Sequence, residues 1–240
     1  MNKYEIIKKI ENFAPPQSAQ EWDCIGFMTE TENVDIKKIM LCLTPTKNII
    51  KQAIQLNCDM IISHHPMFQV ELCNELITKD FKPRIDIYSA HTNLDIANGG
   101  TTDTLIKSIN FPTTYLLENN KDDFVRYIKL DKPIEVNALA QLLRKISPNL
   151  RYTNNNNIKT VQKIGFCAGS GADFINSAQE NGTDCFITGD LKFHTAIEAE
   201  IVLFDIGHFD SEILILPVLK KIIGNDVEVV FAKEKNPFLY

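Results

Sequence analysis

The sequence predicts an α/β fold of duplicated α/β units, with mixed, mainly parallel sheets covered by helices. Short apolar runs of strand length alternate with segments of helical spacing, which is typical of such sheets. A helix and strand pattern in the first half also returns in the second; the matching segments are AIQLNCDMIISHHPM and SAQENGTDCFITGDLKFH, then YSAHTNLD and LFDIGHFDSE. An internal repeat of this kind predicts a duplicated unit, although chance similarity between ordinary βα units is a competing interpretation.

Periodicity predicts each element in turn. Helical spacing of isoleucines predicts a first helix over Lys3–Phe13, which the pair Pro15-Pro16 ends. Apolar runs predict strands over Ile39–Leu43, Met60–Ser63, Asp86–Ala90, Val125–Leu130, Lys163–Cys167, Cys185–Thr188, Ile201–Ile206 and Val227–Ala232. Between them we expect helices over Lys47–Leu56, Cys73–Lys79, Asp103–Ile109, Val136–Ile146, Ala172–Glu180, His194–Glu200 and Ser211–Ile222.

The length allows one large domain or two small ones. With 240 residues and 44% apolar side chains, the chain can bury a substantial core. We expect a first α/β unit over 1–118 with the HHP and HTNLD motifs, and a second over 119–240 with the GSG, ITGD and GHFDSE motifs. The C-terminal part, about 201–240, is expected to pack back on the first unit.

Charge and hydropathy exclude several classes of protein. A net charge of -6 and a pI near 5.4 argue against a nucleic-acid or membrane-surface binder, which would need clustered Lys and Arg. The first thirty residues lack the apolar core of a secretory leader, and no stretch has the length of a membrane span. We therefore expect a soluble cytoplasmic protein, whose six cysteines, with no C-x-x-C pair, are buried reduced thiols.

Histidines follow the predicted strands. His64 and His65 come after Met60–Ser63, His91 after Asp86–Ala90, and His208 after Ile201–Ile206. The carboxyl ends of strands in an α/β sheet border the crevice where ligands bind. The sequence therefore predicts imidazoles along one sheet edge.

Two carboxylates stand four residues beyond histidines. Asp95 follows His91 and Glu212 follows His208 at this spacing, which brings each pair onto one face of a helical turn. Imidazoles mixed with carboxylates suit Zn, Fe or Mn, whereas Ca and Mg prefer oxygen throughout. A bridging carboxylate can hold two ions about 3.5–4 Å apart. Taken singly, a His-His pair or an HxxxD spacing is more often a surface or capping feature.

Other motifs are open to two interpretations. The turn Ala168–Gly171 between a strand and a helix could contact a phosphate, but a tight turn is the favoured interpretation. His194 could line a pocket or lie at the surface. Trp22 and Asp23 could shape the mouth of a cleft, although a tryptophan in a small satellite core is favoured.

The ordered set of motifs resembles a known family. The blocks EWDCIGFM, MIISHHPMF, AHTNLDIANGG, IGFCAGSG, DCFITGDLKFH and DIGHFDSE span nearly the whole chain. Together they resemble the GTP cyclohydrolase 1 type 2 homologs, also called the NGG-interacting-factor-three-like family. One departure is Cys24, where many relatives carry asparagine.

The resemblance implies a set of functional residues. It implies that a pair of divalent cations is bound by His64, His65, Asp95, His208 and Glu212. His91 is expected beside the site as a catalytic or supporting group. The resemblance also implies two intertwined halves and a toroidal homohexamer.

Two functions are therefore expected. The first is a metal-dependent hydrolase that acts on a small-molecule ligand, such as a nucleotide or another N-heterocycle. The second is a non-enzymatic metal-binding protein, either a metal chaperone or a protein-interaction scaffold. The same ligands would serve both functions.

Overall fold

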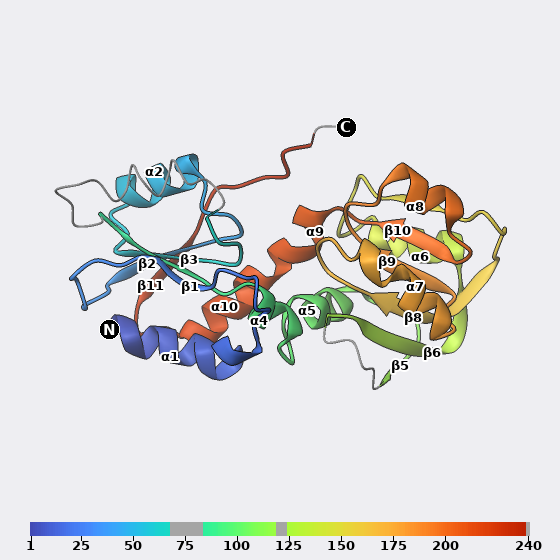
Figure 1. Cartoon of the computed structure of the whole chain (residues 1–240), viewed down its shortest axis with the longest axis horizontal. Helices are drawn as coiled ribbons and strands as arrows, with labels where there is room; N and C mark the ends of the chain where they lie inside the picture. Colours follow the sequence, from blue (N-terminus) through green and yellow to red (C-terminus); the bar gives the residue numbers. More distant parts are fainter. Residues whose placement is uncertain (68–83, 119–123, 239–240) are drawn as a thin grey trace. The chain divides into compact units, whose positions relative to one another are not determined.

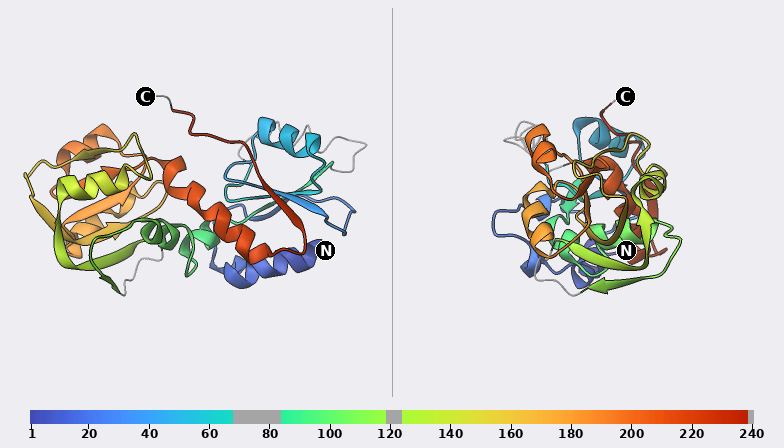
Figure 2. Two further views of the ribbon diagram at one scale, coloured as in Figure 1. Left: turned by 180° about the vertical axis from the view of Figure 1, so that it is seen from behind. Right: turned by 90° about the vertical axis from the view of Figure 1, so that its right-hand side faces the viewer.

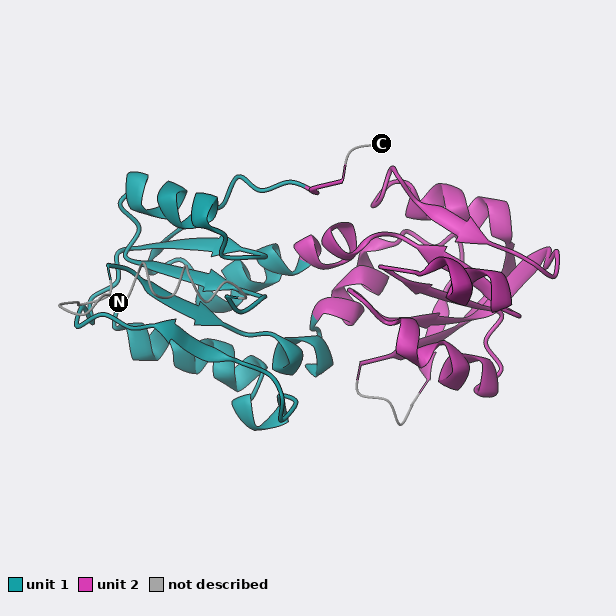
Figure 3. Ribbon diagram, turned by 45° about the horizontal axis from the view of Figure 1, so that its top comes forward, with its two compact units in different colours: residues 1–100, 215–235 teal, residues 101–214, 236–240 magenta. Residues whose placement is uncertain are grey.

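The computed structural model describes residues 1–67, 84–118 and 124–238. The chain forms two compact units (Figure 3). Unit 1 comprises 1–100 and 215–235, and unit 2 comprises 101–214 and 236–240. Each unit therefore takes segments from two separate parts of the sequence. That residues 1–118 and 119–240 form two α/β units stays a prediction.

Unit 1 is built on a five-stranded sheet of order β1-β4-β3-β2-β11. Its strands are β1 (Gly26–Thr29), β2 (Lys38–Cys42), β3 (Met60–Ser63), β4 (Asp86–Ser89) and β11 (Glu228–Phe231). The pairings β2 with β3, β3 with β4 and β2 with β11 are parallel, and β1 pairs antiparallel with β4. The strand near the C-terminus thus completes the sheet begun by the first hundred residues.

Helices cover both faces of this sheet (Figures 1 and 2). The helices and helical turns of unit 1 are α1 (Lys3–Phe13), η1 (Pro16–Ser18), α2 (Lys47–Gln55), α4 (Thr92–Ile96) and α10 (Leu216–Ile223). α2 lies on one face, and α1 packs with α10 on the other. Alternate strand residues supply the core under α2, where Met40 and Ile61 join Ile49, Ile50 and Ala53.

Unit 2 is built on a six-stranded sheet of order β5-β6-β8-β9-β10-β7. Its strands are β5 (Tyr115–Glu118), β6 (Arg126–Glu135), β7 (Arg151–Thr153), β8 (Thr160–Phe166), β9 (Cys185–Thr188) and β10 (Val202–Asp205). Only the central pairings, β8 with β9 and β9 with β10, are parallel. The α/β fold with two mixed sheets is confirmed, and parallel pairing prevails in unit 1 alone.

Both faces of the second sheet are also covered. The helices and helical turns are α5 (Thr101–Ser108), α6 (Val136–Leu143), η2 (Ala172–Phe174), α7 (Ile175–Glu180), α8 (Phe193–Glu198), α9 (His208–Glu212) and η3 (Ile213–Ile215), of which η3 runs into α10. Along β9, Cys185 and Ile187 join a core with Leu105 and Leu139, whereas Phe186 faces a second core. This alternation is what a strand buried on both faces requires.

The two sheets contain the same four-strand pattern, which supports the predicted duplication. The order β1-β4-β3-β2 in unit 1 matches β7-β10-β9-β8 in unit 2. An aspartate directly precedes β3 in unit 1 and β9 in unit 2, and both aspartates accept the same kind of hydrogen bonds. Asp59 Oδ2 accepts from both backbone N–H groups of Lys37–Lys38, and Asp184 Oδ2 accepts from those of Gln162–Lys163.

Most predicted elements are present, and the missed ones share a cause. β1, β5 and β7 were not expected from the sequence. Each is an antiparallel strand at a sheet edge, and the two in unit 2 are largely exposed. None of the three contains a run of buried apolar residues, which is the pattern that identifies the central strands.

The helix expected over Ser211–Ile222 is wrong as one continuous element. The structure has α9, the single turn η3 and then α10. Pro217 lies in the first turn of α10, where its missing N–H is tolerated, and it disfavours a continuous helix before it. The expected helix Cys73–Lys79 lies outside the described residues. None of the helices in the described ranges has the length and apolar character to cross a membrane.

We expect Asp184→Ala to lower the free energy of unfolding by about 1–3 kcal/mol, because two strand N–H groups lose a charged acceptor. Chemical denaturation measures this loss. The exposed Asp173 provides a control, and Asp173→Ala should change stability by less than about 0.5 kcal/mol. Equal unfolding midpoints for the parent and Asp184→Ala would contradict the assigned role.

Candidate metal centre

Three histidines of unit 1 meet at one edge of its sheet. His64 and His65 follow β3 directly, and His91 comes two residues after β4. Because β3 and β4 are parallel and paired at Ser63 and Ser89, the residues after them leave the sheet at the same edge. The ring centroids lie 4.9, 5.1 and 5.5 Å apart. One ligand atom from each ring lies within 4.8 Å of the others, so the cluster could hold a metal ion.

Asp95 adds a carboxylate to this cluster. α4 begins directly after His91, so Asp95 comes about one helical turn later. Asp95 Oδ1 lies 3.5 Å from Nε2 of His64. His64 is fully buried, whereas Asp95 is partly exposed. Unit 1 by itself therefore offers nitrogen and oxygen donors of the kind that Zn, Fe or Mn accepts.

Hydrogen bonds determine which ring nitrogen of His64 and of His91 carries the lone pair. Nδ1 of His64 donates to the carbonyl oxygen of Ala90 at 3.0 Å, and Nδ1 of His91 donates to Oδ1 of Asp23 at 2.8 Å. These oxygens only accept, so Nδ1 carries the hydrogen and Nε2 carries the lone pair. Proteins orient metal-binding histidines in this way.

Asp23 is the buried centre of the loop that supports His91. Its side chain is 2% exposed and also accepts from the backbone N–H and the hydroxyl of Thr92, at 3.0 and 2.5 Å. Burial opposes ionisation of Asp23, but the hydrogen bonds from His91 and Thr92 prevail and hold the pKa of this carboxyl below its usual value. Asp23 is thus an anionic partner for the His91 ring.

His65 is oriented through a chain of contacts that includes the C-terminal part of unit 1. Its Nδ1 lies 2.7 Å from Oγ1 of Thr44. The carboxylate of Glu234 accepts from the backbone N–H groups of Leu43 and Thr44, at 2.6 and 3.4 Å. Burial raises the pKa of Glu234, and those two N–H groups partly offset the effect. The segment after β11 thereby fixes the loop that holds His65.

Unit 2 contributes a second pair of donors. α9 carries His208 and Glu212 one turn apart, with Nε2 of His208 3.0 Å from Oε2 of Glu212. Nδ1 of His208 lies 2.7 Å from Oδ2 of Asp190, which follows β9. An imidazole held by a carboxylate through Nδ1 therefore occurs in unit 2 as it does in unit 1.

The two carboxylates set the protonation of His208. Burial lowers the pKa of this imidazole, but hydrogen bonds and charge attraction from Glu212 and Asp190 outweigh burial and raise the pKa to about 9. Below that pH the metal-free imidazole is a cation between two anions. A metal ion that binds Nε2 must displace a proton, so acid weakens binding.

The turn Ala168–Gly171 is a tight turn, which confirms the favoured interpretation. The N–H of Ala168 donates to Thr102 Oγ1 at 3.1 Å, and that of Gly169 donates to Ser211 Oγ at 2.9 Å. The N–H of Gly171 donates to Thr188 Oγ1 at 2.7 Å. These donors are engaged within the protein and do not form a phosphate cradle.

Gly169 is required beside Glu212. Its φ is +70°, and a Cβ built on it would overlap Oε1 of Glu212 and lie 3.5 Å from Nε2 of His208. Only glycine combines this backbone conformation with this approach. Gly169 thus leaves room for the carboxylate at the expected metal site.

The outcome for the predicted site residues differs between the units. The structure brings His64, His65, His91 and Asp95 together in unit 1, and it pairs His208 with Glu212 in unit 2. That both groups bind the same ions stays a prediction.

Sequence reasoning missed three partners of the histidine rings. Thr44 contacts His65, Asp190 contacts His208, and Asp23 contacts His91. The members of these pairs lie 21, 18 and 68 residues apart in the sequence. A pattern based on local spacing cannot find such pairs. For Asp190, its position two residues after a strand was the one available signal.

Two expectations near these residues are wrong. Trp22 does not belong to a satellite core, because its side chain is 71% exposed. Cys24 is exposed rather than buried. His194 lies at the surface. The free thiols of Cys42, Cys58, Cys167 and Cys185 are buried as expected, and Cys73 lies outside the described residues.

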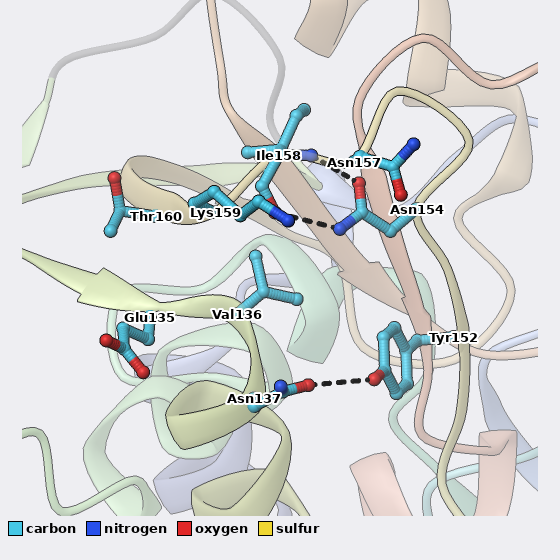
Figure 4. A pocket seen from close by; sticks show the side chains of 9 residues that line it. All are labelled: Glu135, Val136, Asn137, Tyr152, Asn154, Asn157, Ile158, Lys159 and Thr160. Atoms are coloured by element: carbon cyan, nitrogen blue, oxygen red, sulfur yellow. Dashed lines mark hydrogen bonds between the residues drawn. The ribbon is translucent and has the colours of Figure 1, made fainter.

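Unit 2 also contains a polar cleft of about 460 Å³ (Figure 4). It is lined by Glu135, Val136, Asn137, Tyr152, Asn154 and the stretch 157–160. The Tyr152 hydroxyl donates to Asn137 Oδ1, and the Asn154 amide bonds to the backbone of Ile158 through both of its polar atoms. The cleft shares no residue with the metal donors, and these contacts engage the side chains of Asn137, Tyr152 and Asn154.

Comparison with known proteins identifies relatives over the whole chain. A family model described as Duf34/NIF3 (NGG1p interacting factor 3) matches residues 1–237. The chain is 32% identical to the GTP cyclohydrolase 1 type 2 homolog of Clostridium perfringens, over 99% of both chains. It is 30% identical to NIF3-like protein 1 of Drosophila melanogaster, over 98% of this chain and 87% of that protein.

Solved structures show the same fold. Reduced HcgD from Methanocaldococcus jannaschii has a TM-score of 0.83 at 27% identity and covers 98% of both chains. Protein ybgI, of unknown function, has a TM-score of 0.85 at 22% identity and covers 99% of this chain and 100% of that chain. At its lower identity the second likeness shows the fold alone.

We expect Gly169→Ala to weaken metal binding about 10- to 100-fold, because the new methyl group displaces Glu212. Gly182 is a matched control, since it also has a φ of +70° but nothing lies within 4 Å of its built Cβ. Both variants should lose about 1–2 kcal/mol of stability from backbone strain. Metal titration should separate them, and equal metal affinities would contradict the steric role of Gly169.

We expect Glu234→Ala to lower metal affinity about 10-fold, because the loop that holds Thr44 and His65 loses its acceptor. Glu234→Gln keeps one acceptor oxygen and should restore part of the affinity. Isothermal titration with zinc measures both variants, and Glu5→Ala, which changes an exposed residue of α1, is the control. If all three variants bind zinc like the parent, Glu234 does not support the site.

Proposed function

The chain belongs to the Duf34/NIF3 family, and from this premise we propose that it is a dinuclear metal-binding protein and a metal-dependent hydrolase. The proposed substrate is a nucleotide or another N-heterocycle. One observation supports the proposal most strongly: ring nitrogens of His64, His65 and His91 converge, and hydrogen bonds fix the rings. Orienting bonds of this kind are typical of metal-binding histidines.

The proposed donors are His64, His65, Asp95, His208 and Glu212. They would hold two divalent cations, with Zn, Fe or Mn favoured by the mixture of nitrogen and oxygen atoms. The donor chemistry of both units supports this assignment, because each unit presents imidazole together with carboxylate. Their joint use of the same two ions is the part of the proposal that comes from the family resemblance.

His91 is the proposed proton carrier. Bound divalent cations would supply Lewis-acid chemistry, activating water and stabilising negative charge. Nε2 of His91 carries the lone pair that can accept a proton, because Nδ1 is engaged by Asp23. The carboxylate of Asp23 would stabilise the resulting imidazolium.

The names of several relatives support the substrate class. The Clostridium perfringens protein is called a GTP cyclohydrolase 1 type 2 homolog. For this chain we therefore propose hydrolytic opening of a purine ring with release of formate. The negative net charge agrees with a site where bound cations, rather than lysines or arginines, attract an anionic ligand.

A second candidate function is non-enzymatic. The family is described by an interaction, as NGG1p interacting factor 3, and the fly relative is called NIF3-like protein 1. A metal chaperone or protein-interaction scaffold would use the same donors without turning over a substrate. We also propose a cytoplasmic location, which agrees with the free thiols. We further propose that the chain assembles into a toroidal homohexamer, which analytical ultracentrifugation can check.

We expect protein purified without an affinity tag to contain two equivalents of metal and to release formate from GTP. His65→Ala and Glu212→Ala should each lower metal content and abolish turnover, because each removes a donor. Elemental analysis and a formate assay measure these effects. The exposed His194 provides the control, and His194→Ala should match the parent.

Two results would change the assignment. Full metal content in both His65→Ala and Glu212→Ala would contradict the proposed donors. Metal-loaded parent protein that releases neither formate from GTP nor phosphate from simple phosphoesters would favour the non-enzymatic function.

A further inference from the structure

An exposed tryptophan lies beside the histidine cluster of unit 1. Trp22 is the only tryptophan in the chain, and its side chain is 71% exposed. Its ring centroid lies 6.5 Å from that of His91, with the planes at 80°. His91 in turn lies 5.1 Å from His64 and 5.5 Å from His65. The indole therefore lies beside His91, whose ring is next to those of two proposed metal donors, His64 and His65.

The loop that carries Trp22 is firmly held. The next residue, Asp23, has a side chain that is 2% exposed and bonds to His91, Thr92 and the backbone N–H of Cys24. The backbone N–H of Asp23 also donates to the carbonyl of Gln20. Trp22 is thus an exposed side chain on an anchored backbone, which lowers the entropy lost when a ligand contacts it.

The orientation of the indole leaves a face for a ligand. A perpendicular contact with His91 is an edge-to-face arrangement, so the two rings do not stack on each other. The high exposure of Trp22 is consistent with an open face of the indole. Stacking on a tryptophan is available to any flat aromatic ring and contributes without reading its hydrogen-bonding groups.

We propose that Trp22 is the platform on which the flat heterocycle of the ligand stacks while the ligand occupies the metal cluster. This inference rests on the proposed function and names the residue that selects aromatic ligands. The 6.5 Å between the indole and His91 argues for this occupant, because a flat ring that stacks on Trp22 would lie beside the histidine cluster. Trp22 is a ligand-binding residue in this proposal, and His91 remains the proton carrier.

The single tryptophan makes the test specific, since its fluorescence reports on this position alone. Metal-loaded protein is titrated with GTP, guanosine and inorganic triphosphate. We expect GTP and guanosine to quench the emission and triphosphate to leave it unchanged, because triphosphate has no ring. Quenching by triphosphate equal to that by GTP would overturn the proposal.

Variants test the contribution to affinity. We expect Trp22→Leu to weaken GTP binding about 10-fold in equilibrium dialysis with metal content unchanged, and Trp22→Phe to retain most of the affinity. Tyr4 is the control because it is an aromatic residue of unit 1 that is 53% exposed on α1, and Tyr4→Leu should bind GTP like the parent. Parent-like GTP binding by Trp22→Leu would overturn the stacking role alone.

Two further outcomes distinguish this proposal from the function on which it rests. Metal-loaded parent protein that binds no GTP would overturn both the nucleotide substrate and the stacking role. Emission that changes with protein concentration but not with GTP would show that a second copy of the chain covers Trp22, and this would overturn the ligand assignment.

Discussion

The candidate site depends on the parallel pairing of β3 with β4, in register at Ser63 and Ser89. This register brings the two consecutive histidines after β3 beside the one after β4. The same serines satisfy the backbone there, because their hydroxyls donate to the carbonyl oxygens of His65 and His64, at 2.7 and 2.8 Å. Burying polar groups is unfavourable unless they are hydrogen-bonded, and these bonds make a fully buried His64 compatible with a stable sheet.

The duplicated pattern shows how one scaffold serves two different sheet edges. β3 ends at Ser63 and β9 ends at Thr188. The two strands occupy the same position in the matching orders β1-β4-β3-β2 and β7-β10-β9-β8. Unit 1 continues with two histidines, whereas unit 2 continues with Gly189 and Asp190. A Cβ on Gly189 would lie 2.7 Å from the backbone nitrogen of His208, so this glycine permits close packing of loops. Unit 1 therefore presents an imidazole cluster, and unit 2 presents one imidazole between carboxylates.

Carboxylates beside the imidazoles give the donors of each unit their electrostatic character. Asp23 bonds to His91, and Asp190 and Glu212 flank His208. Negative charge beside these imidazoles favours cations and disfavours anions. An anionic ligand would consequently need bound metal to approach these residues. The acidic composition of the chain and a nucleotide ligand are compatible for this reason.

The sequence by itself determined the types of the main elements and the position of His64, His65 and His91 after strands, because hydrophobic periodicity is a local property of the chain. It did not determine β1, β5 and β7, three edge strands without a run of buried apolar residues. Only the tertiary structure decided that Asp23 holds His91 across 68 residues and that Trp22 is exposed beside the cluster. Contacts between distant segments depend on how strands pair and loops pack, and no local pattern encodes them.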